Sequence, residues 1–237
     1  MTLFDETFAE RAPREIAPGA VHVPGFLTLQ QQGWIVDRFR EWAAGPVPPH
    51  SPKVRGHEMS VRTVCLGWHW QPYRYSRAAT DVNGNRVLDF PDWMVRLGRR
   101  ALAEADPARW SSSERDEGAS RIETTPAADY TPDTALVNFY DEAAKMGMHQ
   151  DRDERTLEPV VSLSIGDSCL FRFGNTESRT KPYTDLTLAS GDLFVFGGPS
   201  RLAFHGIQKI YPDTAPEGCG LERGRINITM RVTGLSD

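Results

Sequence analysis

The chain has 237 residues, of which 39% are hydrophobic and 25% charged, as expected for one soluble globular domain or for a core with an appendage. No apolar run approaches the roughly 18–20 residues of a membrane-spanning helix, and the charged residues 1–16 do not resemble a secretory signal. The net charge of −5 argues against bulk nucleic-acid binding, although net charge hides local clusters.

The three cysteines, Cys65, Cys169 and Cys219, are odd in number, lie far apart and include no Cys-x-x-Cys pair. This spacing argues against a disulfide framework and against a thiolate zinc site. It favours a reducing compartment, so a cytoplasmic location is expected.

Two helices are predicted in the N-terminal half. The first begins at Thr28, a suitable N-cap, and ends before the Gly45-Pro46 pair, with apolar residues at helical spacing in between. The second runs from about Pro91 to just before Pro107. A polar connector is expected at 111–127.

Residues 47–89, between the predicted helices, are rich in turn-forming, aromatic and basic residues. From Lys53 to Arg77 there are five basic residues and one acid, Glu58. Charge alone fits a solvated face as well as a binding surface.

After about Ala135 the chain becomes a series of short β-rich runs separated by Gly, Pro or polar turns. Their close spacing predicts an antiparallel sandwich or jelly roll, with the helices covering one outer face. The runs are 135–140, 158–165, 168–174, 185–190, 191–198 and 225–232.

In the last run, alternation places the polar residues on one face and the apolar residues on the other. If it forms an edge strand, the polar face is solvated. If it lies inside the roll, Arg225 and Arg231 need an anionic partner, such as a dicarboxylate or a phosphate, because a buried guanidinium is costly unless paired. The polar face consists of Arg225, Asn227, Thr229 and Arg231.

Three residues form a candidate metal site. His149 and Asp151 point to the same side of an extended chain, and His205 follows a later strand. Two histidines and one carboxylate suit non-haem Fe(II), but the same set can hold zinc for hydrolysis, or a metal without redox chemistry. The arginine-bearing strand favours an oxygenase, since zinc hydrolysis has no use for a dicarboxylate clamp.

The motifs Asn138-Phe-Tyr140, HQDRDE (149–154), SGDLFVFGGPSRLAFHGI (190–207) and RINITMR (225–231) occur in this order. With them, the sequence from about residue 20 to the C-terminus resembles the AlkB family of Fe(II)/2-oxoglutarate-dependent nucleic-acid demethylases. The resemblance implies a mostly β fold with flanking helices and a double-stranded β-helix (jelly-roll) core. It implies a single domain, 1–237, with an N-terminal helical extension at 1–130, a nucleotide-recognition lid at about 47–89 and a catalytic core at 135–235.

The resemblance also implies roles for single residues. His149, Asp151 and His205 are expected to bind iron. Arg225 is expected to pair with the distal carboxylate of 2-oxoglutarate, and Arg231 with the end nearer the iron. The expected 2-oxoglutarate-binding residues are Asn138, Tyr140, Arg225, Asn227 and Arg231.

Five residues are expected to contact the substrate. Trp68 is expected to stack on the base opposite His149, and Asp153 to complement a positively charged lesion. Met59 and Tyr73 lie in the recognition segment, and Arg179 in the loop after the FRFG run.

The expected reaction removes N-linked methyl groups, as in 1-methyladenine or 3-methylcytosine, from single-stranded DNA or RNA. The methyl leaves as formaldehyde, while 2-oxoglutarate and O₂ become succinate and CO₂. A monomer without a membrane partner is expected. A modified tRNA base or a small metabolite is an alternative substrate, and a sensor that binds metal and 2-oxoglutarate without turnover is the non-enzyme alternative.

Overall fold

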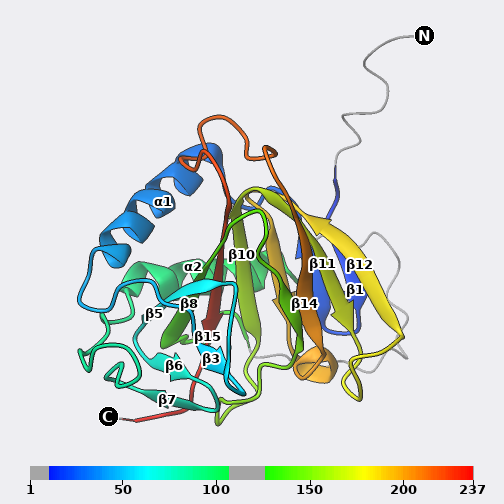
Figure 1. Cartoon of the computed structure of the whole chain (residues 1–237). Helices are drawn as coiled ribbons and strands as arrows, with labels where there is room; N and C mark the ends of the chain where they lie inside the picture. Colours follow the sequence, from blue (N-terminus) through cyan, green and yellow to red (C-terminus); the bar gives the residue numbers. More distant parts are fainter. Residues whose placement is uncertain (1–10, 107–125, 237) are drawn as a thin grey trace.

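Two antiparallel sheets face each other in the computed structural model, which describes residues 11–106 and 126–236 (Figure 1). The mostly β fold with flanking helices is therefore confirmed. Most of the predicted connector at 111–127 lies outside the described residues.

The larger sheet has seven strands, and the smaller sheet has four. In spatial order the larger sheet contains β1 (Arg14–Ala17), β2 (Ala20–Val23), β13 (Leu193–Phe196), β10 (Val160–Gly166), β15 (Arg225–Arg231), β8 (Thr134–Tyr140) and β5 (Arg62–Leu66). The smaller sheet contains β12 (Tyr183–Leu188), β11 (Ser168–Gly174), β14 (His205–Tyr211) and β9 (Met146–His149). Two hairpins complete the segment 47–89, namely β3 (Lys53–Val54) with β4 (His57–Glu58), and β6 (His69–Gln71) with β7 (Arg74–Ser76).

All six predicted β-rich runs form strands, and the N-terminal extension contributes strands to the sheet in addition to its two predicted helices. Strands β1, β2 and β5 come from that extension and join the larger sheet, where β2 pairs with β13 and β5 with β8. Strands β1 and β2 have four residues each, too few for a clear alternation. The sequence prediction also missed β9 and β14.

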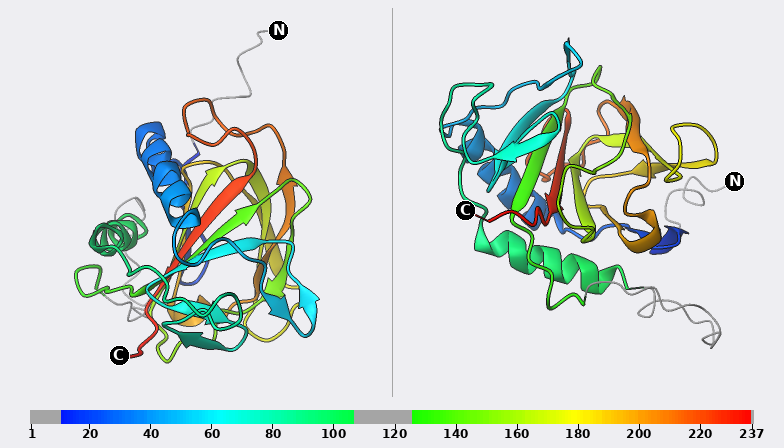
Figure 2. Two further views of the ribbon diagram at one scale, coloured as in Figure 1. Left: turned by 60° about the vertical axis from the view of Figure 1, so that its left-hand side comes forward. Right: turned by 90° about the horizontal axis from the view of Figure 1, so that it is seen from below.

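Both helices form where they were predicted. Helix α1 (Leu29–Ala43) begins with a capping box, in which Thr28 and Gln31 each bond the other's backbone N–H. Helix α2 covers Asp92–Glu104. The two helices lie on one side of the larger sheet (Figure 2), and Ile35, Val36 and Met94 pack there against strand residues such as Leu163 and Ile228.

Strand β15 lies between β10 and β8 near the middle of the larger sheet, and all seven of its residues are buried. The edge-strand interpretation of this run is therefore wrong. Ile226, Ile228 and Met230 belong to the core beneath the helices, so the arginine-bearing face points between the two sheets. Beside it, a second apolar cluster that includes Phe171, Phe173, Phe194, Phe196 and Ile207 fills the space between the sheets.

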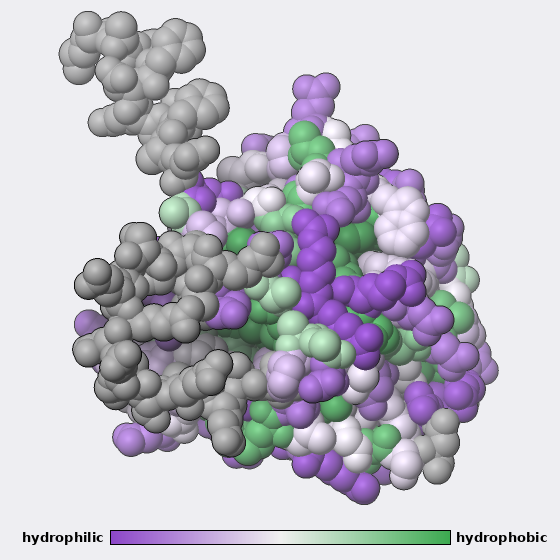
Figure 3. All heavy atoms as spheres, turned by 180° about the vertical axis from the view of Figure 1, so that it is seen from behind, coloured by the Kyte–Doolittle hydropathy of each residue, from purple (hydrophilic) through white to green (hydrophobic). Residues whose placement is uncertain are grey.

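On the face turned away from the viewer in Figure 1, hydrophilic side chains are interspersed with apolar ones (Figure 3). Neither helix of the described ranges is long and apolar enough to cross a membrane. Cys65, Cys169 and Cys219 are buried free thiols, so no disulfide forms among them.

Candidate active site

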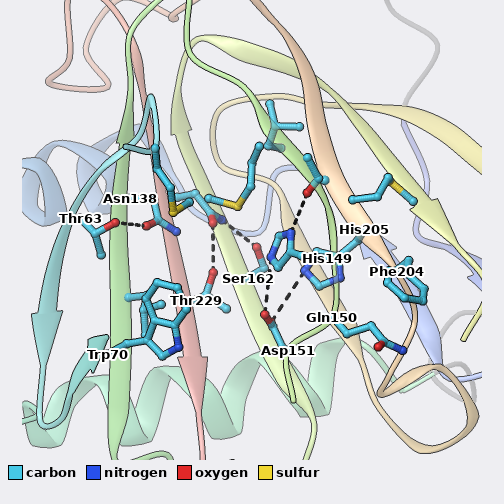
Figure 4. A pocket seen from close by; sticks show the side chains of 18 of the residues that line it. Thr63, Trp70, Asn138, His149, Gln150, Asp151, Ser162, Phe204, His205 and Thr229 are labelled. Atoms are coloured by element: carbon cyan, nitrogen blue, oxygen red, sulfur yellow. Dashed lines mark hydrogen bonds and ion pairs between the residues drawn. The ribbon is translucent and has the colours of Figure 1, made fainter. Parts of the chain in front are cut away.

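A cavity of about 460 Å³ opens between the two sheets and is lined by residues from both of them (Figure 4). It brings together all three predicted metal ligands, all five predicted 2-oxoglutarate contacts and four of the five predicted substrate contacts. These residues are His149, Asp151, His205, Asn138, Tyr140, Arg225, Asn227, Arg231, Met59, Tyr73, Asp153 and Arg179.

The side chains of His149, Asp151 and His205 converge on one point of the cavity wall (Figure 4). Nε2 of His149 lies 3.6 Å from Oδ1 of Asp151, and Nε2 of His205 lies 3.8 Å from Oδ2. Both separations are longer than a hydrogen bond, and they suit donor atoms that share one ion.

The backbone sets the orientation of both imidazole rings. Nδ1 of His149 lies 2.9 Å from the carbonyl oxygen of Gly147, and Nδ1 of His205 lies 3.0 Å from that of Ala203. With Nδ1–H as the donor, each neutral ring presents the lone pair of Nε2. Strands β9 and β14 pair at His149 and His205, and a Cβ on Gly206 would lie 2.5 Å from the Met146 carbonyl oxygen, so the close approach needs glycine.

The electrostatics of the three residues favour metal binding. Burial opposes ionisation of Asp151, but the Arg231 guanidinium and the two histidines lower its pKa to about 2. Burial, followed by the neighbouring His149, lowers the pKa of His205 to about 4. At neutral pH the site therefore offers a carboxylate and a neutral imidazole, the protonation states that a metal ion requires.

Arg225 is fully buried at one end of the cavity. Its Nη2 donates to Ser164 Oγ at 2.8 Å, whereas Nε and Nη1 have no hydrogen-bond partner among the described residues. Because a buried cation with unpaired donors is costly, this end of the cavity fits an anionic group.

Arg231, at the other end of β15, already has carboxylate partners. Its Nη2 lies 2.7 Å from Asp151 Oδ1, and its Nη1 lies 3.1 Å from Glu154 Oε1 and 3.1 Å from the Tyr75 hydroxyl. Tyr75 in turn donates to Glu154 at 2.6 Å. Arg231 therefore orients a candidate metal ligand, and its Nε stays unpartnered within the described chain.

Amide and hydroxyl groups cover the sheet between the two arginines. Thr63 donates to Asn138 Oδ1 at 2.7 Å, and Asn227 donates to Ser162 Oγ at 2.7 Å. Thr229 donates to Asn227 Oδ1 at 3.0 Å. The resulting surface between the arginines is polar and is fixed by its own hydrogen bonds.

Trp68, predicted to stack on the base, does not line the cavity. It lies in the bend between β5 and β6, is 7% exposed, and carries the Arg77 guanidinium 3.8 Å above its ring. The cavity wall is formed instead by Trp70 (Figure 4). Its Nε1 donates to Asp153 Oδ2 at 2.8 Å. The indole that faces the cavity is therefore that of Trp70 and not that of Trp68, because the bend turns the first indole away.

The basic cluster of the segment 47–89 divides in two. Arg62 lies over the Phe139 ring, Arg74 bonds Gln71, and Arg77 covers Trp68. Arg55 lines the cavity. Only part of the cluster therefore faces the space where a ligand would enter.

Arg201 is a positioning residue whose contacts with the loop around Asp151 could not be predicted from the sequence. Its guanidinium donates to the backbone carbonyl of Asp151, to the carbonyl of Glu158 at 2.7 Å and to Glu154 Oε2 at 3.0 Å. It thereby fixes the loop that carries Asp151.

Comparisons with known proteins agree with this geometry. The family model of the 2OG-Fe(II) oxygenase superfamily matches residues 19–231. The alpha-ketoglutarate-dependent dioxygenase AlkB homolog of Caulobacter vibrioides is 48% identical over 232 residues, which cover 92% of this chain and 90% of that protein.

Two further relatives are similar over most of the chain. The DNA N(6)-methyladenine demethylase ALKBH1C of Arabidopsis thaliana is 34% identical over 228 residues, which cover 91% of this chain and 49% of that protein. The chain thus spans about half the length of this plant relative. The solved structure of OsALKBH1 superimposes with a TM-score of 0.83 at 31% identity and covers 93% of this chain and 100% of that one.

Proposed function

Since the chain belongs to the AlkB family of the 2OG-Fe(II) oxygenase superfamily, we propose that it removes methyl groups oxidatively from alkylated nucleic-acid bases. One observation carries this proposal. A facial set of two histidines and one carboxylate shares a cavity with a fully buried arginine whose Nε and Nη1 find no partner in the part of the chain that the structure describes.

The site fits Fe(II) and 2-oxoglutarate. His149, Asp151 and His205 would hold the iron, and the unpartnered nitrogens of Arg225 would bind the distal carboxylate of 2-oxoglutarate. When bound, Fe(II), 2-oxoglutarate and O₂ supply the oxidation of a methyl C–H bond, with succinate and CO₂ as co-products.

The other cavity residues position both ligands. Arg231 holds Asp151 in place and lies at the iron end of the 2-oxoglutarate site. Asn138, Tyr140 and Asn227 line the polar surface between the two arginines. Their hydrogen bonds orient the ligands and limit the access of water to the reacting methyl group.

A flipped base would stack on Trp70, with Asp153 beside it to complement a positively charged lesion. Met59, Tyr73 and Arg179 line the same cavity. DNA is the first substrate to test because the Arabidopsis relative carries the name of a DNA demethylase. Single strands should be preferred, since a flipped base must leave its pair, and we expect the protein to act as a monomer.

The test measures succinate and formaldehyde release by the protein supplied with Fe(II), 2-oxoglutarate and air. A single-stranded DNA oligonucleotide with 1-methyladenine is compared with its unmethylated twin and with the RNA version. We expect one formaldehyde per lesion removed, dependent on the methyl group. Asp151→Ala, shown by its Tm to be folded, should release neither product.

Two outcomes would contradict the proposal. Succinate release without formaldehyde, at a rate that does not depend on the oligonucleotide, would indicate that the substrate is a modified tRNA base or a small metabolite. Binding of Fe(II) and 2-oxoglutarate without consumption of either would make the protein a sensor.

A further inference from the structure

A second cluster of metal-ligating side chains lies in the segment 47–89, and none of its members lines the cavity. His50 precedes β3 and pairs through its backbone with Thr63 of β5. His69 is the first residue of β6, and Asp81 lies in the turn after β7. One donor atom from each residue lies within 4.8 Å of the other two.

The contacts within the cluster leave ring nitrogens unsatisfied. Nε2 of His69 lies 2.6 Å from Asp81 Oδ1, and the two imidazole centroids are 5.2 Å apart. His50 Nε2 and His69 Nδ1 are both buried, and neither has a hydrogen-bond partner within the described ranges. Such buried groups are rare in folded proteins because leaving them unpaired costs free energy, so protein contacts alone do not complete this cluster.

His50 has the same backbone arrangement as the two histidines of the cavity. Its Nδ1 lies 3.4 Å from the Pro48 carbonyl oxygen, two residues earlier in the chain. His149 and His205 likewise bond the carbonyl two residues earlier through Nδ1. With Nδ1–H as donor, His50 presents the lone pair of Nε2, the form in which histidine binds metal ions.

The charges around the two rings also suit a cation. Asp81 adds a carboxylate whose side chain is 33% exposed, so water or an ion can reach it. Two imidazoles and one carboxylate are a donor set that zinc takes, with water in the fourth position.

We propose that His50, His69 and Asp81 form a second metal site, separate from the cavity, that binds Zn²⁺. The ion would tie together three stretches of the segment 47–89 that are distant along the chain. Through His69 it would hold β6, whose next residue is Trp70, and through His50 it would hold β5, where Thr63 bonds Asn138. The site would thus stiffen the cavity wall without taking part in the oxidation.

The test separates this site from the one in the cavity. The double variant His149→Ala/Asp151→Ala removes two ligands of the cavity site and serves as the background. After equilibrium dialysis against Zn²⁺, we expect this background to retain one zinc per chain by mass spectrometry. Adding His50→Ala or Asp81→Asn should weaken zinc binding at least about 10-fold in a chelator competition.

The design includes a matched control and a readout that does not depend on activity. His57→Ala removes an exposed histidine of the same segment and should leave zinc binding unchanged. Asp81→Asn keeps a hydrogen-bond acceptor for His69, so this variant should fold even if His50→Ala does not. Saturating Zn²⁺ should raise the Tm of the background by about 5 °C and leave that of the Asp81→Asn variant unchanged.

Either of two results would overturn the inference. The first is a background that retains no zinc, and the second is zinc binding by the Asp81→Asn and His50→Ala variants that is as tight as that of the His57→Ala control. In both cases the cluster would be a hydrogen-bonded pair with a neighbouring histidine. Because zinc is measured without turnover, this result is independent of whether the proposed demethylation is found.

Discussion

The guanidinium of Arg225 is fully buried at the end of the cavity. Its Nη2 donates a hydrogen bond to Ser164, whereas Nε and Nη1 have no partner within the described chain. Removing a guanidinium from water costs several kcal/mol unless its donors are paired. A planar carboxylate can accept two parallel hydrogen bonds from such a group. The arrangement is therefore preorganised for a carboxylate ligand.

We predict that Arg225→Ala raises the KM for 2-oxoglutarate at least about 100-fold, since two charge-assisted hydrogen bonds of about 1.5–3 kcal/mol each are lost. Succinate release as a function of 2-oxoglutarate concentration measures this effect. Arg223→Ala, at an exposed position two residues earlier, is the matched control and should leave the KM unchanged. An unchanged KM in Arg225→Ala would mean that the carboxylate binds elsewhere.

Substitution of Asp153 can separate the effect of its charge from that of its hydrogen bond in the same cavity. Its Oδ2 accepts a hydrogen bond from Trp70 Nε1 at 2.8 Å. Asp153→Asn keeps an acceptor for the indole but removes the negative charge. We expect kcat/KM to fall about 10-fold for cationic 1-methyladenine, and much less for neutral N6-methyladenine. Equal losses on both oligonucleotides would remove the electrostatic role.

At the scale of elements, the bend between β5 and β6 decides which tryptophan reaches the cavity. Gly67 has a φ of 75°, and a Cβ there would lie 2.0 Å from the Asp133 carbonyl oxygen. A side chain at this position would therefore clash with the backbone. The bend turns Trp68 under Arg77 and leaves Trp70, on the strand itself, facing the cavity.

The two tryptophans should respond to substitution in opposite ways. Trp70→Ala should raise the KM for the methylated oligonucleotide about 10-fold, because stacking contributes about 1–3 kcal/mol per base. It should lower the Tm less than Trp68→Ala does, because Trp70 is only partly buried. Trp68→Ala should lower the free energy of unfolding by about 3–5 kcal/mol. Steady-state kinetics and urea unfolding of both variants test the assignment, which is wrong if Trp68→Ala alone weakens substrate binding.

Strands that form continuous β-rich runs could be predicted from the sequence, whereas β9 and β14 could not. In β15, polar and apolar residues alternate without exception, so the pattern predicted which residues share the arginine face but not whether that face points inward. Strands β9 and β14 carry His149 and His205. Strand β9 has only four residues, and in β14 Gly206 and Lys209 stand among the apolar residues, so neither strand shows a clear β-rich run. Their pairing, which brings the two rings to a centroid distance of 4.5 Å, is a long-range contact that no local pattern encodes.

At the scale of the whole molecule, β15 separates the main apolar core from the cavity. Its apolar face packs beneath α1 and α2, and its polar face lines the space between the sheets. Burial of the apolar face stabilises the fold, which allows the opposite face to carry two arginines that would be unfavourable without partners. Stability and ligand binding thus depend on opposite faces of one strand.

Asp192 joins the N-terminal strands to this sheet. Its carboxylate accepts hydrogen bonds from the His22 ring at 2.9 Å, from the Gly25 and Ala189 backbone N–H groups at 3.0 and 2.9 Å, and from Arg11 at 2.8 and 3.0 Å. Burial opposes its ionisation, but the hydrogen bond from His22 and those that follow lower the pKa of Asp192 below the ordinary 3.8. The ionised form is therefore the one that stabilises the fold.

We predict that Asp192→Asn lowers the free energy of unfolding by about 2–4 kcal/mol at pH 7, because buried donors lose a charged acceptor. A carboxyl group with a lowered pKa in the folded state stabilises fully above its unfolded pKa, and this contribution is lost as pH falls through the folded pKa. The difference between wild type and variant in urea unfolding should therefore narrow between pH 5 and pH 3. Asp37→Asn, which breaks an exposed ion pair with Arg40 on α1, should show almost no difference at any pH. A difference for Asp192→Asn that stays constant from pH 7 to pH 3 would show that hydrogen-bond geometry, and not the charge, joins the N-terminal strands to the sheet.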